Sequence, residues 1–171
     1  MEPCTANAFL KIDGVVGDSR EDRHHEWISL LSIAHGLSLR PADPNNVDHG
    51  FGESRHEDFV VTKNIDKASP RLYELCCSGE QIREAVADVC GVHPLAFCFT
   101  VRMSHVVICD ISLRGSSPAN AQIFTADAPI FTETLRFSYA AIEWIHRALD
   151  ADGRVLGNVL AGWNLRTGTK R

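Results

Sequence analysis

The feature that most constrains this chain is a long alternation of apolar and polar residues between Phe97 and Leu113. Apolar side chains occupy the odd-numbered positions, with His105 as the exception, and polar ones such as Arg102 and Asp110 fall on even-numbered positions. A repeat of two residues is typical of a half-buried strand in an antiparallel sheet. A straight strand of this length would span about 50 Å at ~3.3 Å per residue, so we expect it to bend or divide at His105.

Four other segments have a strand-like pattern, which makes the chain mainly β. They are residues 9–12, which lead into an Asp13-Gly14 turn, and residues 27–39, 85–92 and 130–139. Residues 27–39 have two unlike faces, because one parity carries large apolar side chains with His35 and the other parity is small and weakly polar. The small face consists of Ser32, Ala34, Gly36 and Ser38.

One helix is predicted, with Ser69 as its N-cap, Pro70 at its first position and Gly79 at its end. Its apolar stripe consists of Leu72, Leu75 and Cys76. Residues 141–149 are ambiguous, because their apolar side chains recur at helical spacing whereas Ile142 and Trp144 suit a strand. Periodicity alone favours a helix there.

Residues 41–58 predict a long exposed loop. They contain two prolines, two glycines, the turn-forming pair Asn45-Asn46 and many charges, with little periodic apolar content. Loops of this length are uncommon in compact domains unless they carry function or contact a partner.

Composition favours a single soluble domain spanning residues 1–171. The chain is 44% hydrophobic and 23% charged, and its formal charge of -5 provides no footprint for a phosphate backbone. We therefore expect no nucleic-acid partner. Charged residues interrupt the most apolar stretches, so we expect no membrane span. Residues 1–9 lack the basic and apolar regions of a cleavable signal peptide.

The six cysteines include no C-x-x-C pair of the kind that zinc sites use. In a chain without a signal sequence we expect them to be reduced thiols. Cys90, Cys98 and Cys109 lie in predicted strands, where we interpret them as small core residues.

Motifs for catalysis are also weak. His25-Glu26 and His56-Glu57 lack the second histidine of H-E-x-x-H, so we interpret both pairs as solvated polar residues. The sequence has neither a G-x-S-x-G elbow nor a complete dinucleotide-binding loop. We therefore assign no catalytic residue, no cofactor and no metal ligand.

Several strings of residues carry a resemblance to one family. They are Phe9-Leu10-Lys11-Ile12 with Gly17 and Ser19, FVVTKNIDKASP over residues 59–70, Cys77-Ser78-Gly79, and Gly162-Trp163-Asn164. With the order of the predicted elements, they resemble the haemolysin-coregulated protein (Hcp) family over nearly the whole chain. That family forms the inner tube of the bacterial type VI secretion system.

The resemblance implies a small antiparallel β-barrel of two packed sheets, flanked by one α-helix and carrying a long extended loop. It makes residues 138–146 a strand, because a helix would leave the barrel without one wall. In the family, six copies close into a ring, and rings stack into a hollow tube. The chain would be assembled in the bacterial cytoplasm and then secreted by sheath contraction, without a cleavable signal peptide.

The resemblance also implies partners and roles. Expected partners are further copies of the chain, the type VI sheath and spike proteins, and small effector proteins in the lumen. The strand after the first turn lines the channel in the family, which matches the small face of Ser32, Ala34, Gly36 and Ser38. We expect the long loop to stack rings, and a solvated loop without a partner is the alternative. Its candidate residues are Asp43, Asn45, Asn46, Asp48, His49 and Phe51.

Two other functions are weighed against the tube subunit. A small-molecule-binding or hydrolytic β-barrel, with His35 or His105 in acid-base chemistry, predicts a closed apolar pocket inside one subunit. A tube protein with an added toxin domain would need more chain after Trp163-Asn164 than the sequence has.

Overall fold

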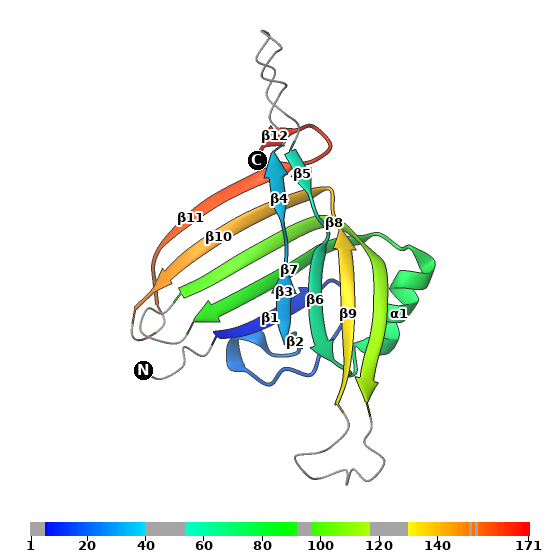
Figure 1. Ribbon diagram of the computed structural model, residues 1–171. Helices are drawn as coiled ribbons and strands as arrows, with labels where there is room; N and C mark the ends of the chain where they lie inside the picture. Colours follow the sequence, from blue (N-terminus) through cyan, green and yellow to red (C-terminus); the bar gives the residue numbers. More distant parts are fainter. Residues whose placement is uncertain (1–5, 40–53, 92–96, 117–129, 151, 153) are drawn as a thin grey trace.

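The computed structural model describes residues 6–39, 54–91, 97–116, 130–150, 152 and 154–171 (Figure 1). This part of the chain is mainly β with one α-helix, as predicted. The strands are β1 (Ala6–Ile12), β2 (Ile28–Leu30), β3 (Ser32–Ala34), β4 (Leu37–Leu39), β5 (Ser54–His56), β6 (Phe59–Asn64), β7 (Ile82–Gly91), β8 (Phe97–Ser116), β9 (Ile130–Ser138), β10 (Ala141–Leu149), β11 (Val155–Asn164) and β12 (Thr169–Lys170). The helices are the 3-10 helix η1 (Asp22–His24) and the α-helix α1 (Ser69–Ser78).

Two antiparallel sheets share strand β8. The first sheet has the order β12-β11-β10-β8-β7-β1-β2, and the second places β3, β6, β9 and the far half of β8 side by side. Between β2 and β3 the chain crosses from one sheet to the other, where the Leu31 amide donates to the Thr62 carbonyl at 2.7 Å. The expected two packed sheets with one helix are confirmed. Because the ladder is interrupted at Leu31, the barrel is not fully closed.

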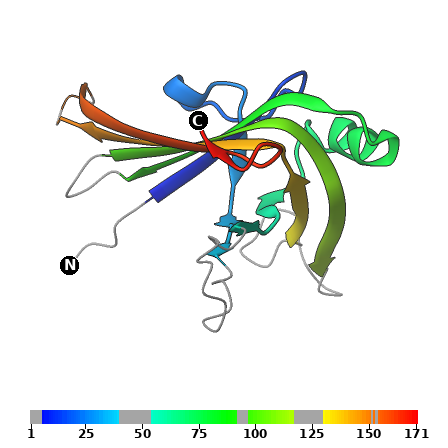
Figure 2. The ribbon, with the colours of Figure 1, turned by 90° about the horizontal axis from the view of Figure 1, so that it is seen from above.

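Strand β8 turns from one layer into the other (Figure 2). It bends at His105, as predicted, where the backbone φ is 54°. Before the bend the odd-numbered Val101 and Met103 are buried, and after it the even-numbered Val106 and Ile108 are buried instead. One residue in the left-handed region therefore turns the apolar face of the strand over.

The prediction that a single parity stays buried up to Leu113 is wrong. A register shift against β9 between Ile108 and Asp110 follows the bend, which is the mark of a β-bulge. Cys109 at the shift is exposed, and beyond it the odd-numbered Ile111 packs against the core again, whereas Leu113 near the end of the strand is 53% exposed. Cys109 is therefore not the core residue that its place in the alternation indicated.

The core fills the space between the two sheets and helix α1. Side chains from both sheets and the helix are completely or almost completely buried there: Leu10, Ile12, Ile28, Phe59, Leu72, Met103, Ile108, Leu135, Phe137 and Ile142. Burial of each large aliphatic or aromatic side chain contributes about 1.5–3 kcal/mol. This packing occupies the interior that a ligand-binding barrel would leave open.

Helix α1 has the predicted bounds, and Leu72 and Leu75 form its buried stripe. Gly79 ends it at φ 64°, and its amide donates to the Leu75 carbonyl at 3.1 Å. The prediction that Ser69 caps the N-terminus is wrong. Ala68 occupies the cap position and makes no side-chain cap bond. Ser69 is the first residue of the helix, and its hydroxyl bonds to Lys63 and Glu133 in a buried polar cluster.

The ambiguous segment after Tyr139 is a strand. Strand β10 pairs with β8 on one side and β11 on the other, so its backbone groups are satisfied by neighbours in the sheet. The helical spacing of its apolar residues was misleading, since Ile142 and Ile145 are buried although they lie on opposite faces of the strand.

Cys90 and Cys98 form a disulfide across β7 and β8. The two residues are directly opposite in the register, with their Cα atoms 4.3 Å apart. The expectation of reduced thiols is therefore wrong for this pair. Cys76, Cys77 and Cys109 are free within the described residues, and Cys76 of α1 packs against the core.

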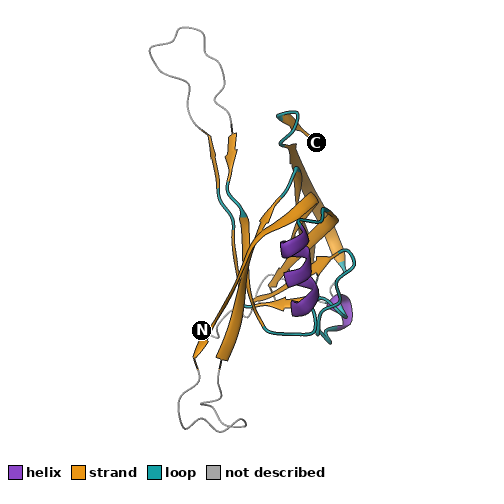
Figure 3. Ribbon diagram, turned by 90° about the vertical axis from the view of Figure 1, so that its right-hand side faces the viewer, coloured by secondary structure: helices purple, strands orange, loops and turns teal. Residues whose placement is uncertain are grey.

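Strands β4 and β5 form a two-stranded ribbon that rises from the body of the molecule (Figure 3). Leu37 lies opposite His56 and Leu39 lies opposite Ser54. The predicted loop over residues 41–58 is therefore too long at its end, because residues 54–56 are a strand. Neither strand pairs with any other described strand.

Candidate functional site

One half of the first sheet extends beyond the core as a wing (Figure 2). We define the wing as residues 6–8 of β1, 88–91 of β7, 97–100 of β8, 145–149 of β10 and 155–160 of β11. One row across its core-side face runs from Val89 to Phe99, His146 and Val159, each paired with the next. Val89 and Phe99 are only half-buried, and Val159 is 71% exposed. The described part of the chain therefore leaves apolar surface of the wing uncovered.

Strand β11 forms the outer edge of the wing. It pairs with β10 along its length, whereas on its other edge β12 pairs only with Trp163 and Asn164. Both faces of this edge are apolar and open, with four large exposed side chains: Val155, Leu156, Val159 and Leu160. An exposed apolar edge strand is a template for association, because its unpaired amide and carbonyl groups can bond to another chain.

A second apolar surface lies on the ribbon and at the chain crossing below it. Leu31, Leu37 and Leu39 are all more than half exposed. These leucines share a parity with Ile33, which packs against the core. The apolar face predicted for residues 27–39 is thus covered by the molecule's own core only in its middle.

The four residues expected to line a channel lie on or between β3 and β4. Ser32, Ala34 and Ser38 are exposed, and Gly36 stands between the two strands. A Cβ on Gly36 would lie 2.5 Å from the carboxylate of Glu57, the far end of an exposed and flexible side chain. A larger side chain at this position would therefore require Glu57 to move aside.

The expected ring-stacking residues cannot be placed in the same way. Asp43, Asn45, Asn46, Asp48, His49 and Phe51 lie outside the described residues. Their role stays a prediction from the sequence.

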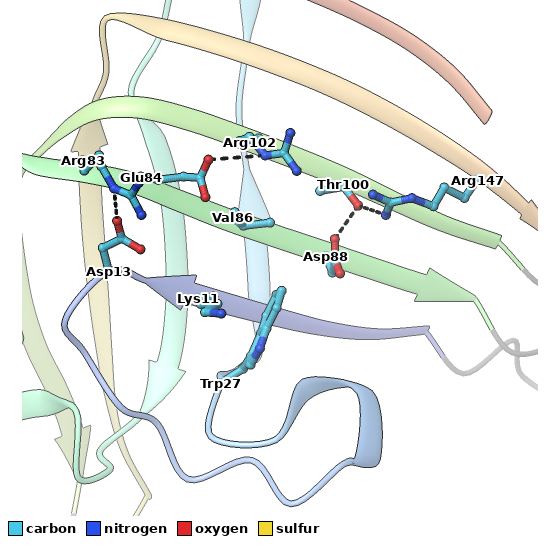
Figure 4. Close-up of a pocket in the computed structure, with 10 residues that line it drawn as sticks. All are labelled: Lys11, Asp13, Trp27, Arg83, Glu84, Val86, Asp88, Thr100, Arg102 and Arg147. Carbon is cyan, nitrogen blue, oxygen red and sulfur yellow. Dashed lines mark hydrogen bonds and ion pairs between the residues drawn. The ribbon is translucent and has the colours of Figure 1, made fainter. Parts of the chain in front are cut away.

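The outer face of the first sheet carries a charged cleft of about 330 Å³ (Figure 4). Arg83 donates from Nε to Asp13 at 2.8 Å, and Arg102 lies 3.4 Å from Glu84. These contacts link β7 to the turn after β1 and to β8. They hold neighbouring strands together, since Arg83 and Arg102 are each paired with a carboxylate.

A chain of hydrogen bonds continues along the same face. The Thr100 hydroxyl accepts from Arg147 at 2.6 Å and donates to Asp88 at 2.5 Å. Asp88 also contacts His24 of η1 at 3.1 Å, and His24 stacks on Phe9 with 4.2 Å between the ring centroids. These contacts fasten η1 to the sheet.

Three rings meet at the base of the ribbon. The Tyr139 hydroxyl lies 2.7 Å from Nε2 of His35 and 2.9 Å from Nδ1 of His56. Burial raises the pKa of Tyr139 well above its usual value and lowers the pKa of His35 and of His56. The interpretation of His56 as a solvated polar residue is therefore wrong.

Two polar clusters were not predicted from the sequence: the three rings at the base of the ribbon, and a buried ion pair between Lys63 and Glu133. Lys63 and Glu133 share the buried parity of their strands with Val61 and Leu135. A charged side chain in a buried parity signals a buried pair. His35 gave the same signal within its strand, but nothing local in the sequence identified His56 and Tyr139 as its partners.

The described residues contain no cluster of three or more histidine, cysteine, aspartate or glutamate side chains suited to a metal ion. None of the helices that the structure describes is long and apolar enough to cross a membrane.

Comparisons with known proteins agree with this fold. A family described as "Type VI secretion system effector, Hcp" matches residues 9–146. "Protein hcp1" of Pseudomonas aeruginosa is 27% identical over 161 residues, which cover 92% of this chain and 94% of that protein. The "Major exported protein" of the same species is 26% identical over 155 residues, covering 87% of this chain and 84% of that protein.

A solved structure extends the likeness to three dimensions. Hcp1 from Salmonella typhimurium has a TM-score of 0.71 at 23% identity, with 97% of this chain and 99% of that chain covered. At this identity the likeness concerns the fold. Together with the match to the family over residues 9–146, it shows that the chain belongs to the Hcp family of type VI secretion system proteins.

Proposed function

We propose that this chain is a structural subunit of a type VI secretion inner tube, in which six copies close into a ring and rings stack into a hollow tube. The observation that carries the proposal is the exposed apolar edge of the wing at β11. Family membership and the whole-chain likeness to Hcp proteins support it.

The wing explains why a lone subunit would be incomplete. Val159 and Leu160 are 71% and 57% exposed on opposite faces of one strand. Burial of each such side chain against a second copy would contribute about 1.5–3 kcal/mol. Pairing of the open β11 edge would also satisfy backbone groups and fix the register of the contact.

A ring requires two different surfaces on each copy. A contact between unlike surfaces repeats around an axis, and it closes when the rotation between neighbours divides a full turn. The wing provides one surface, and the leucines of the ribbon and chain crossing provide a second apolar surface on another part of the molecule. The subunit therefore has the two unlike patches that a cyclic assembly needs.

Within the tube, we assign the small side chains of Ser32, Ala34 and Ser38 to the channel wall, with Gly36 beside them. Residues of the loop at 41–58 would stack successive rings. The sheath and spike proteins would surround and tip the tube, and small effector proteins would travel in its lumen. The exported relative supports secretion from the bacterial cytoplasm to the outside.

We propose that the role is mechanical and not catalytic. A ligand-binding or hydrolytic barrel would need an enclosed apolar pocket, whereas Leu10, Met103 and Phe137 are completely buried in the interior. Of the residues named for acid-base chemistry, His35 is engaged by Tyr139, and His105 forms the bend of β8.

The test removes the apolar edge. Val159→Asp with Leu160→Asp places two charges on β11, and we expect the purified protein to become monomeric. The control is Ile65→Asp, at an apolar position in the connection to α1 that is 50% exposed, and this variant should still assemble. The measurement is mass by light scattering, with circular dichroism to show that all variants are folded. Assembly of the folded double variant like that of wild type would refute the assignment of the interface.

A further inference from the structure

The ribbon is fastened to the body of the molecule at one place. Its two strands pair only with each other among the described strands. At its base the Glu57 amide donates to the Gly36 carbonyl at 3.0 Å, and His35 and His56 flank Tyr139 on the turn between β9 and β10. The direction in which the ribbon leaves the body therefore depends on these few contacts (Figure 3).

The hydrogen bonds at this base depend on protonation. A phenol has one hydroxyl proton, so Tyr139 donates to only one imidazole and accepts from the N–H of the other. This arrangement requires that at least one histidine is neutral. When both imidazoles carry two protons, both nitrogens that face the hydroxyl are donors, and its proton loses its acceptor.

Electrostatic repulsion between the two histidines also favours a state in which at least one of them is neutral. Two imidazolium rings on one phenol would repel each other, and both sit in a partly desolvated site. Burial, with the charge of His56, lowers the pKa of His35, and burial lowers the pKa of His56. The neutral state is therefore the one that the folded base favours.

The surrounding charges come from each neighbouring element. Glu57 raises the pKa of His35 in opposition to burial, and Asp58 contributes to the raised pKa of Tyr139. The adjoining cleft of about 380 Å³ is also lined by two cations. The charged groups that face the rings are Arg55 on β5, Glu57 and Asp58 before β6, and Arg136 on β9.

We propose that His35, Tyr139 and His56 form a pH-sensitive latch that holds the ribbon in one direction at neutral pH and releases it when both imidazoles are protonated. Phe59 keeps its contact with the His35 ring, 5.5 Å between centroids, only while the latch is closed. The ribbon would then move about the Gly36 and Glu57 hinge without unfolding of the two sheets. The latch acts within one subunit, so it does not depend on ring formation.

The experiment is hydrogen exchange of the ribbon amides in the full chain at about pH 7.5 and about pH 5, after correction for intrinsic exchange rates. We expect exchange at residues 37–39 and 54–56 to rise severalfold at acid pH, because the open state of the ribbon becomes more populated. Amides of β10 serve as an internal reference and should keep their protection.

Variants separate the latch from general acid effects. His35→Gln with His56→Gln cannot titrate and should give ribbon exchange that is the same at both pH values. Tyr139→Phe keeps the ring but loses the hydroxyl, and it should give fast ribbon exchange already at neutral pH. His25→Gln alters an exposed histidine at the end of η1, which is not part of the latch, and should behave as wild type.

Each result of the exchange measurements either supports or overturns the proposed latch. An unchanged ribbon in wild type at acid pH, or a full acid response in the double glutamine variant, would overturn the latch. If the double variant does not fold, each single variant should show a reduced acid response, and a full response in both would overturn the latch as well. Light scattering at neutral pH on the same samples tests ring formation separately.

Discussion

Lys63 on β6 and Glu133 on β9 form an ion pair at 2.7 Å with both side chains buried in the protein interior. Two further acceptors complete the shell of the ammonium group: Asp66 at 2.9 Å and the Ser69 hydroxyl at 3.0 Å. Ser69 in turn donates to Glu133 at 2.7 Å. The cluster thus joins the start of helix α1 to two strands of the second sheet.

Removal of one partner should destabilise the fold strongly. Lys63→Met leaves the Glu133 carboxylate buried without its cation, so we expect a loss of about 3–5 kcal/mol in the free energy of unfolding. The double variant Lys63→Met with Glu133→Leu replaces the pair by apolar groups and should recover most of that loss. Urea denaturation measures both. A double variant as unstable as the sum of two single variants would contradict this account.

Gly17 lies so close to a neighbouring backbone segment that the addition of one methyl group, as in Gly17→Ala, tests its role in packing. A Cβ at this position would collide with the backbone of Trp27. We expect Gly17→Ala to cost about 1–3 kcal/mol of stability through overpacking, measured by thermal or urea unfolding. Gly157→Ala is the matched control, since no atom lies within 4 Å of its Cβ position, and its effect should stay within about 0.5 kcal/mol.

The disulfide should contribute to stability by joining β7 to β8. Cys90 and Cys98 are separated by 8 residues, a short loop, so we expect reduction to cost about 2 kcal/mol. The measurement is urea denaturation with and without a thiol reductant. Wild type should respond to the reductant and Cys90→Ser with Cys98→Ser should not. Equal sensitivity of both proteins would show that the effect has another source.

Stability should fall as the pH falls from neutral into the acid range because of His35 and His56. Both pKa values are lowered in the folded state, so the unfolded chain binds more protons between the folded pKa values and the ordinary value of about 6.5. Their contribution is fully present above that ordinary value and is lost as the pH falls through the window toward the folded pKa values. The comparison is the unfolding free energy of wild type and His35→Gln with His56→Gln across pH. Parallel pH profiles would contradict the assignment.

The alternation of apolar and polar residues, with the positions of proline and glycine, predicted most of the fold. The bend at His105, the bounds of helix α1 and the strand pattern of β1, β7 and β9 follow from local residue properties. What could not be predicted depends on pairing between distant segments. The disulfide needs the register of β7 on β8, and the reversal of buried parity after His105 needs a left-handed backbone that the alternation does not encode.

The candidate site was less accessible to sequence reasoning. The exposed surface of β11 was not predicted, because an apolar strand at a sheet edge has the same composition as one in a core. The ribbon could not be predicted, because nothing local in the sequence indicates that residues 54–56 pair with residues 37–39. The family resemblance predicted a strand over residues 138–146, and the structure has it at residues 141–149, since helical spacing and strand burial cannot be distinguished there by periodicity.

The most direct test of the central claim is the mass and shape of the purified wild-type protein. Light scattering should give six subunits of 18.9 kDa, about 113 kDa, and electron microscopy should show rings with a central hole. A folded species of single-subunit mass at every concentration, without ring-shaped particles, would contradict the proposal that β11 and its wing are covered by further copies of the chain.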